Sequence, residues 1–193
     1  MLTHKGTQTI ETPRLILRQA RLQDAEPMFR NWASDPEVTK YLTWPTHQSV
    51  AVSETVIGSW LQAYEKENYY QWMIVLKELG EPVGSISAVR QNERTEEAEI
   101  GYCIGSRWWH RGITTEALQA VIDFLFGEVG MNRVSARHDP NNPHSGGVMR
   151  KCGMKYEGTN RACDRNNQGI CDTAQYSILR NAWQKAALSR GRG

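Results

Sequence analysis

The sequence predicts an α+β fold, with one central, mixed, mostly antiparallel twisted sheet and helices on both of its faces. The length of 193 residues suits one domain. Short apolar runs typical of strands alternate with segments of helical periodicity. The centre of the chain also has a hairpin pattern, which pairs strands in antiparallel fashion. We therefore expect a single domain over residues 1–193, with its core at about 10–182.

The N-terminal third is expected to contribute one strand and several helical segments. Residues 15–17 follow a proline and predict the first strand. Asp24 is expected to cap a short helix that ends near Trp32. Asp35 begins a further helical turn that ends near Leu42. A longer helix is predicted by apolar residues at helical spacing, namely Val52, Val56, Trp60, Leu61 and Tyr64.

The rest of the chain alternates strands with helices. Residues 70–77 and 83–89 predict a hairpin around a turn at 78–81. Residues 97–104 predict the next strand. The remaining expected elements are a helix at 113–128, a strand at 133–138, a helix at 142–152, an antiparallel pair at 154–162 and 172–179, and a last helix at 183–188.

Composition and charge argue against several classes of protein. The net charge of +2 is far from the dense basic face of a DNA-binding protein, so no direct nucleic-acid contact is expected. No run of 18 apolar residues predicts a membrane helix, and the polar N-terminus argues against secretion. The four cysteines lack metal-site spacing, so we expect free thiols, no metal and a cytoplasmic location.

The most informative segment runs from a strand into a helix around Gly112. A glycine at such a junction lets backbone N–H groups converge on one point. These unpaired donors and the helix dipole suit a phosphate. An ordinary connection would also explain one glycine, so this feature needs support from elsewhere. Neither Walker-A spacing nor G-x-G-x-x-G is present, which argues against nucleotide hydrolysis and Rossmann-type binding.

A second segment places two glycines inside a short helix. Asn142 and Pro143 have the order of a helix N-cap and first residue, and Gly153 ends the helix. Gly146 and Gly147 should each cost the helix roughly 1 kcal/mol relative to alanine. We expect that something lies against this part of the backbone.

These two segments, in this order and about 30 residues apart, resemble the GNAT superfamily of acetyl-CoA-dependent N-acetyltransferases. The first is similar to its pyrophosphate loop, and the Trp-x-x-Gly…Thr-Glu-Ala form is similar to the branch that acetylates N-termini of ribosomal proteins. The resemblance covers about residues 10–182. It extends to further motifs, namely Thr12-Pro13-Arg14-Leu15-Ile16-Leu17-Arg18, Glu99-Ile100-Gly101-Tyr102, Asn142-x-x-Ser145 and Lys151-x-Gly153-Met154.

The resemblance implies acetyl-CoA as co-substrate, with no metal. The residues expected to contact it are Cys103, Ile104, His110, Arg111, Gly112, Ile113, Thr114, Thr115, Asn142, Ser145 and Gly147. Two positions depart from the family pattern. Thr114 replaces the usual glycine or alanine of the loop, and Met149 stands where many members have a tyrosine that acts as general acid.

The implied reaction is direct acetyl transfer to an amine in a ternary complex, and the amine must be neutral to attack. At pH 7 this costs ~1.4 kcal/mol for an α-amine of pKa ~8, but ~4.6 kcal/mol for a lysine of pKa ~10.4. An enzyme for N-termini therefore needs only a weak base. Glu99 is the candidate base; it shares a strand face with Glu97 and Cys103. The alternative is that the glutamates at 96, 97 and 99 form a solvated charge cluster.

Ser145 is the candidate acid for the leaving thiolate, although a hydroxyl at this helix position often serves the local backbone. Tyr102 and Tyr156 are weaker candidates. Backbone N–H groups around residues 103–105 would polarise the thioester carbonyl if the strand splays there. Residues that either line an acceptor groove or belong to the core are His138, Trp44, Trp60, Tyr70 and Trp72, and Cys152 is expected to be a core thiol.

The acceptor is expected to be the N-terminus of a protein. A small-molecule amine such as an antibiotic, polyamine or amino acid would need the same chemistry, and a non-catalytic acyl-CoA sensor is a third alternative. The sequence leaves the oligomeric state open between a monomer and a homodimer.

Overall fold

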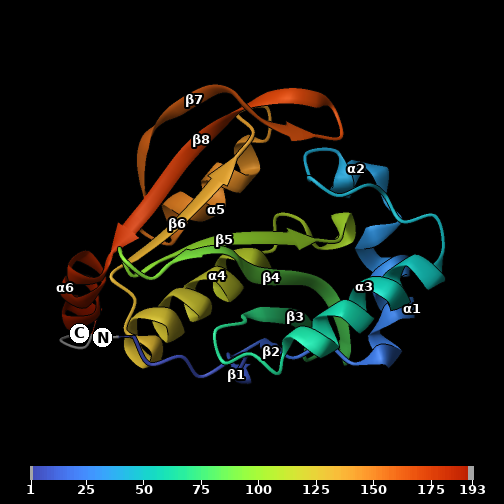
Figure 1. Ribbon diagram of the computed structural model, residues 1–193, viewed down its shortest axis with the longest axis horizontal. Helices are drawn as coiled ribbons and strands as arrows, with labels where there is room; N and C mark the ends of the chain where they lie inside the picture. Colours follow the sequence, from blue (N-terminus) through green and yellow to red (C-terminus); the bar gives the residue numbers. More distant parts are fainter. Residues whose placement is uncertain (1, 191–193) are drawn as a thin grey trace.

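A computed structural model describes residues 2–190 and has one eight-stranded sheet in the order β1-β2-β3-β4-β5-β6-β8-β7 (Figure 1). Every neighbouring pair is antiparallel except β5 and β6. The predicted α+β class is thus confirmed. The strands are β1 (Ile10–Glu11), β2 (Leu15–Arg18), β3 (Gln71–Leu76), β4 (Glu81–Asn92), β5 (Glu97–Ile104), β6 (Arg133–His138), β7 (Lys155–Asn166) and β8 (Gly169–Leu179).

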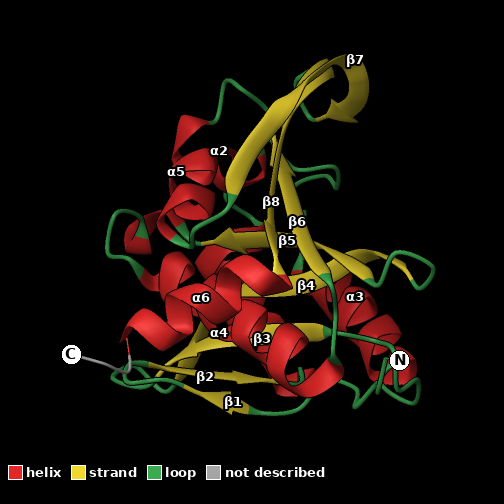
Figure 2. Cartoon of the chain, turned by 90° about the vertical axis from the view of Figure 1, so that its left-hand side faces the viewer, coloured by secondary structure: helices red, strands yellow, loops and turns green. Residues whose placement is uncertain are grey.

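Helices cover both faces of this sheet, as predicted. Helices α1, α2 and α3 contribute to one buried cluster, and α4 and α5 contribute to the other, against which α6 also packs (Figure 2). Two of the expected helices end or continue as wider π turns, at Phe29–Ala33 and Leu125–Val129. The helices are α1 (Ala25–Met28), α2 (Pro36–Thr39), α3 (Val50–Ala63), α4 (Ile113–Phe124), α5 (Pro143–Lys151) and α6 (Arg180–Arg190).

Strand β3 lies between the two clusters, and every one of its residues is buried. Side chains alternate across a strand, so Trp72 and Ile74 pack toward α4 while Met73 and Val75 pack toward α3. A strand buried on both faces reads as a continuous apolar run, which is what its sequence shows. Tyr70 and Trp72 are fully buried and therefore belong to the core.

Two local expectations were wrong. The predicted stripe of α3 includes Val52 and Leu61, yet these are exposed, and the helix buries Ser53 and Ile57 instead. A polar residue can occupy the buried face because its hydroxyl bonds His47. Asp24 is the N-cap of α1, but its side chain makes no capping hydrogen bond to that helix. Its carboxylate accepts from the Arg21 N–H, which caps the preceding 3-10 turn, and from a guanidinium on β2.

Strands β5 and β6 stay paired for only three residues. Glu97 to Glu99 lie opposite Arg133 to Ser135, and beyond these pairs the strands diverge. The β7–β8 hairpin is longer than predicted, and it arches over the gap toward α2 (Figure 1). Within residues 2–190, none of the helices has the length and apolar character needed to span a lipid bilayer.

Candidate active site

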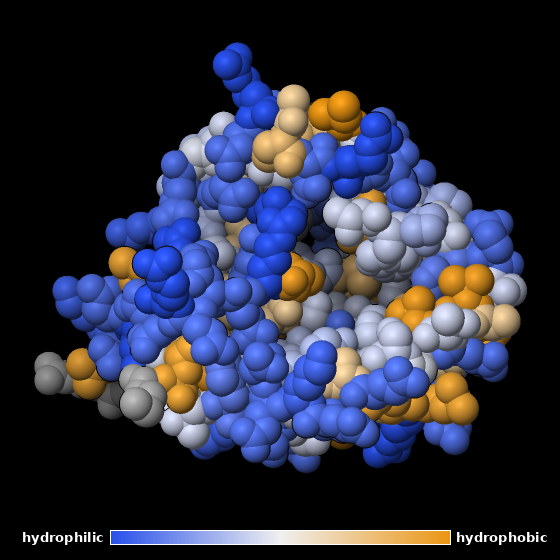
Figure 3. Space-filling view, viewed as in Figure 1, coloured by the Kyte–Doolittle hydropathy of each residue, from blue (hydrophilic) through white to orange (hydrophobic). Residues whose placement is uncertain are grey.

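A cavity of about 700 Å³ opens where β5 and β6 diverge, and Figure 3 shows a hollow in this face of the molecule. One wall is mostly apolar and comes from α1, α3 and the segment after α2, with Trp44 and Trp60 among its residues. The opposite wall is charged and comes from β5, β6 and β7. Trp44 and Trp60 therefore line the cavity, unlike the two aromatic residues of the core.

Strand β5 separates from β6 after Glu99, which meets the condition that the sequence analysis set for a polarising backbone amide. The Gly105 N–H donates to Val83 O on β4, so the amide of Gly105 is already used within the sheet. Because backbone groups alternate along an antiparallel strand, the amides of Tyr102 and Ile104 point to the other side, toward the gap. The backbone amide available to polarise a carbonyl is thus that of Ile104, whereas the Cys103 amide points toward β4.

The loop before α4 has the geometry of an anion cradle. Gly112 is the N-cap in the left-handed region, with φ +74°, and His110 also has a positive φ of 60°. The first amide with an intrahelical acceptor is that of Glu116, which donates to Gly112 O. The amides of Gly112, Ile113, Thr114 and Thr115 therefore have no acceptor within the helix. This loop fits a pyrophosphate, since donors converge at the positive end of the helix dipole.

Arg14 and Glu116 hold this loop in place, a role that the sequence analysis missed. Arg14 donates to Arg111 O at 2.9 Å and to the Glu116 carboxylate at 2.6 Å. Burial opposes ionisation of Glu116, but hydrogen bonds from Thr12 and Arg14 lower its pKa overall. Both residues lie in motifs that carry the resemblance to the GNAT superfamily. This resemblance was the only sequence signal that pointed to them. Their partners lie about 100 residues apart, so no local pattern links them.

The second expected segment lies beside the loop. The rings of His110 and His144 are in edge contact, with centroids 4.7 Å apart. Asn142 is the N-cap of α5 as predicted, but its side chain makes no capping hydrogen bond and lines the cavity. A Cβ on Gly146 would lie 2.5 Å from His138 Nε2, so close packing explains this glycine. The face of Gly147 is open.

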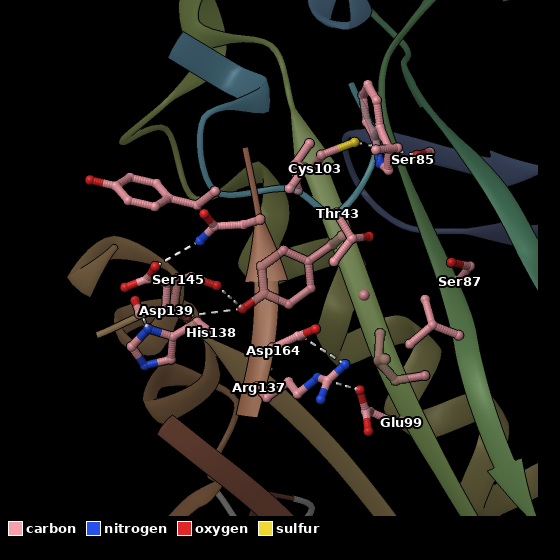
Figure 4. A pocket seen from close by; sticks show the side chains of 18 of the residues that line it. Thr43, Ser85, Ser87, Glu99, Cys103, Arg137, His138, Asp139, Ser145 and Asp164 are labelled. Atoms are coloured by element: carbon pink, nitrogen blue, oxygen red, sulfur yellow. Dashed lines mark hydrogen bonds and ion pairs between the residues drawn. The ribbon is translucent and has the colours of Figure 1, made fainter. Parts of the chain in front are cut away.

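Glu99 lies in the charged wall and is held by ion pairs (Figure 4). Its carboxylate lies 3.0 Å from Arg137 Nε and 4.0 Å from a guanidinium nitrogen of Arg90. Arg137 also contacts Asp164 on β7 at 3.0 Å. The side chain of Glu99 is only 17% exposed, so this residue is not part of a freely solvated cluster. Glu97, on the same face, pairs with Arg133 outside the cavity lining.

Ser145 and Tyr102 meet at the edge of the cavity. The Ser145 hydroxyl donates to the Tyr102 hydroxyl at 3.1 Å, and the phenol donates to Ser145 O at 2.9 Å (Figure 4). Burial raises the pKa of Tyr102. Met149 is buried in the core, as is the Cys152 thiol. Tyr156 is exposed and bonds Thr159, so it lies away from the cavity.

Two further residues, one lining the cavity and one at the hairpin tip beside it, had no sequence signal. His47 is buried, and its Nδ1 lies 2.8 Å from Ser53 Oγ; burial lowers its pKa. Asn167, at the tip of the β7–β8 hairpin, donates from its side chain to Thr39 O and Trp44 O, each at 2.8 Å. These contacts join segments more than 120 residues apart.

His138 is held by the local backbone. Its Nδ1 lies 2.8 Å from Asp139 O, so this nitrogen carries the proton. Its ring packs against Tyr176, with centroids 5.6 Å apart. Within residues 2–190, no group of three or more histidine, cysteine, aspartate or glutamate side chains is placed to hold a metal ion.

The family of the chain follows from comparison with known proteins. The profile of the acetyltransferase (GNAT) domain matches residues 14–155, which include the anion cradle, the divergence of β5 and β6, and α5. The chain belongs to the GNAT acetyltransferase domain family. It is an acetyl-CoA-dependent N-acetyltransferase, and the open cradle at Gly112 fits that co-substrate.

Relatives and solved structures agree with this assignment. The chain is 31% identical over 171 residues to the uncharacterized N-acetyltransferase YoaA of Bacillus subtilis, covering 89% of this chain and 96% of YoaA. It is 30% identical over 131 residues to the putative ribosomal N-acetyltransferase YdaF of Bacillus subtilis, covering 68% and 70% of the two chains. The fold also matches RimL, a ribosomal L7/L12 α-N-protein acetyltransferase solved with coenzyme A. That match has a TM-score of 0.80 at 18% identity and covers 91% and 99% of the two chains.

Proposed function

We propose that this GNAT acetyltransferase acetylates the N-terminal α-amine of a protein, in the manner of the ribosomal-protein enzymes. The proposal includes direct attack by the amine in a ternary complex. It also includes a cytoplasmic location, where acetyl-CoA and new protein N-termini are both available. The observation that carries the proposal is the covered cavity beneath the β7–β8 hairpin.

The cover restricts how an acceptor can enter. Asn167 ties the hairpin tip to the segment after α2, and Asn166 ties the same tip to Asp139 at the end of β6, at 2.7 Å. The tip is thus anchored on both sides of the cavity. A flexible chain end can pass beneath such a bridge, whereas a lysine on a folded surface brings bulk on both sides of its side chain. The geometry therefore favours a terminal amine.

The charge of the cavity argues against a polycationic acceptor. Its walls include three carboxylates and three guanidinium groups, so the two signs balance. A polyamine site would need a clear excess of carboxylates. The residues are Glu99, Asp139 and Asp164, and Arg90, Arg137 and Arg165. The names of YdaF and RimL, which refer to ribosomal proteins, support a protein acceptor.

The proposed roles follow from these positions. The amides of residues 112–115 bind the pyrophosphate of acetyl-CoA, together with His110 and Arg111 of the loop. Acetyl-CoA supplies the activated thioester when bound. The Ile104 amide faces the gap and is placed to polarise a carbonyl there. Asn142 and Gly147 of α5 are the proposed contacts on the opposite side.

Glu99 is the proposed base. The Ser145 hydroxyl is proposed to lie on the side of the leaving CoA thiolate. The ion pair with Arg137 holds the Glu99 carboxylate in its orientation. A weak base is sufficient, because deprotonating an α-amine at pH 7 costs only ~1.4 kcal/mol. The proton can reach the carboxylate through a water molecule in the cavity.

A matched pair of variants tests the base. Glu99→Gln should lower kcat by about 10²-fold, the lower range for loss of acid–base catalysis. The effect should shrink as pH rises and the amine loses its proton without help. Glu97→Gln, on the same strand face but paired with Arg133, is the control and should leave kcat unchanged. A Glu99→Gln rate that equals the native rate at every pH would remove Glu99 from the mechanism.

A panel of acceptors tests the proposed substrate. Release of the CoA thiol is measured with N-terminal peptides, with the same peptides blocked at the N-terminus and bearing an internal lysine, and with small amines. We expect kcat/KM for free N-termini to exceed that for the lysine peptides by at least about 10²-fold, given the ~3.2 kcal/mol difference in deprotonation cost. Equal or faster reaction with a small amine would favour the small-molecule alternative.

A further inference from the structure

The position that usually carries the general acid cannot serve here. Met149 replaces the tyrosine of the family pattern, and its side chain is only 1% exposed within the core cluster. A side chain that protonates the leaving thiolate must therefore stand at another position of the cavity. Tyr102 is a tyrosine that reaches the cavity from β5 rather than from α5.

Contacts fix the phenol of Tyr102 at the mouth of the splay. Its hydroxyl donates to Ser145 O at 2.9 Å and accepts from Ser145 Oγ at 3.1 Å. Both partners belong to the first turns of α5, so the phenol bridges β5 and α5 where β6 has moved away. Both Tyr102 and Ser145 line the cavity, and Figure 4 shows the position of Ser145 there. The backbone amide of Tyr102 also faces this gap.

An anionic sulfur is costly in this part of the protein. Burial raises the pKa of the Cys152 thiol, close to Tyr102, to about 12. Burial also raises the pKa of Cys103, the next residue on β5. A thiolate formed in the same surroundings would meet the same penalty, because desolvation disfavours charge. Protonation removes this penalty at sulfur and passes the charge to the Tyr102 phenol, whose pKa burial also raises, while the hydrogen bond from Ser145 acts against that rise.

We propose that Tyr102 donates the proton to the departing CoA thiolate, and that Ser145 positions the phenol for this step. The inference rests on the acetyl transfer proposed above. As the C–N bond forms and the C–S bond breaks, the phenolic O–H turns away from Ser145 O and transfers its proton to sulfur. The Ser145 hydroxyl donates to the resulting phenolate oxygen. A proton lost by the acceptor nitrogen returns through solvent to the phenolate, so the enzyme ends in its starting state.

The first test removes only the hydroxyl. Tyr102→Phe should lower kcat by about 10²-fold, while the KM for acetyl-CoA changes by less than about twofold. Ser145→Ala should have a smaller effect, since it removes a positioning contact. Tyr176→Phe is the matched control, because its buried hydroxyl bonds Arg150 outside the cavity lining. That control should retain the native kcat.

The second test separates proton donation from a structural role. A ring-fluorinated tyrosine placed at position 102 keeps the ring and the hydroxyl but has a lower phenol pKa. The native rate should stay level on the alkaline side, whereas the fluorinated variant should lose activity as pH rises and its phenol ionises. A merely structural hydroxyl would give the same pH profile in both proteins. This variant also decides the matter if Tyr102→Phe does not fold.

Each reaction is run with an N-terminal peptide and with hydroxylamine as a small nucleophile. If the peptide does not react but hydroxylamine does, the proposed acceptor is wrong. The rates of the native protein and Tyr102→Phe with hydroxylamine still test the role of Tyr102. The proposal for Tyr102 is overturned if Tyr102→Phe keeps kcat within about twofold with both acceptors. An unshifted pH profile of the fluorinated variant would overturn it equally.

Discussion

Two adjacent glycines of α5 have different reasons to be glycine. A side chain at Gly146 would collide with His138 Nε2, so that residue is explained by packing. At Gly147 the nearest atom to an added Cβ is a guanidinium nitrogen of Arg150, at 3.9 Å. Among the described residues, no neighbour therefore requires a glycine at 147, which supports a bound co-substrate against this face.

Gly147 gives a prediction at the scale of one residue. Gly147→Ala should raise the free energy of unfolding of the free protein by up to about 1 kcal/mol, because alanine favours a helix. The bulkier Gly147→Leu should be tolerated in the free protein but should weaken acetyl-CoA binding. Thermal unfolding and calorimetry with acetyl-CoA provide the measurements.

Gly58→Ala is the control for this pair of variants. Gly58 lies in α3, and within residues 2–190 no atom other than those of its own helix turn lies within 4 Å of an added Cβ. The control should therefore gain similar stability with unchanged affinity for acetyl-CoA. Unchanged affinity in Gly147→Leu would show that no co-substrate lies against α5.

Residue roles could be predicted from sequence where the cause is local. Gly112 and Gly153 both have the positive φ expected at a helix end. The roles of Arg14 and Asn167 could not be predicted in this way, because their partners come from distant parts of the chain. Glu99 was placed on the correct strand face, but its guanidinium partners depend on how three strands pack.

At the scale of elements, a polar network fastens three strands of the sheet. Arg133 on β6 contacts Glu157 on β7 across the intervening strand β8, whose Ser177 bonds both residues. The hydrogen bond from Arg133 is the main cause that lowers the pKa of Glu157 to about 2. The pairing of Arg133 with Glu157 therefore makes the free energy of unfolding depend on pH.

The sign of this linkage follows from the lowered pKa. The contribution of Glu157 to the free energy of unfolding is fully present above its pKa in the unfolded chain, ~4.3. It is lost as pH falls toward its pKa in the folded protein, about 2. The unfolding temperature of Glu157→Gln should thus be lower than that of the native protein at pH 7, and the difference should narrow below about pH 4.5. Glu54→Gln, at an exposed position of α3, is the control and should show little difference at any pH. A difference for Glu157→Gln that is constant from pH 7 to pH 3 would contradict this account.

The β7–β8 tip provides a second prediction at this scale. Asn167→Ala removes two hydrogen bonds to the segment at 39–44, each worth about 1 kcal/mol. Amide exchange in residues 39–44 should then become faster, and discrimination against lysine peptides should fall as the cover loosens. Hydrogen exchange and the acceptor panel measure these effects.

The neighbouring residue supplies the control for the tip. Gln168→Ala changes the same turn without removing the bonds of Asn167, so exchange and selectivity should match the native protein. Unaltered selectivity in Asn167→Ala would mean that the cover does not select the acceptor.

Most elements could be predicted, since their patterns are local. The strands at 97–104 and 133–138 have the predicted bounds. The exposed face of α3 was misassigned, because the His47–Ser53 hydrogen bond allows a serine in the interior. The length of the β7–β8 hairpin was underestimated, since residues near its tip are mostly polar and exposed on an outer strand.

At the scale of the whole molecule, the cofactor cradle joins parts that are far apart in sequence. Arg14, just before β2, holds the loop before α4, and α4 in turn packs against α5. The cradle therefore depends on the folded arrangement of both ends of the domain. Binding of acetyl-CoA should thus stabilise the entire fold rather than one loop, because the unfolded chain has no such site.

This linkage gives a prediction for the whole protein. Acetyl-CoA at 100 times its Kd should add about 2.7 kcal/mol to the free energy of unfolding, which corresponds to a rise in Tm of roughly 5–10 °C for a domain of this size. Gly112→Asp is the decisive comparison. The left-handed φ of 74° strains aspartate and asparagine alike, although both tolerate it better than other side chains, so the two variants should lose similar stability and their comparison isolates the charge. The aspartate carboxylate would repel the pyrophosphate, and the ligand-induced rise should disappear, whereas neutral Gly112→Asn should retain part of it. An undiminished rise in Gly112→Asp would place the pyrophosphate elsewhere.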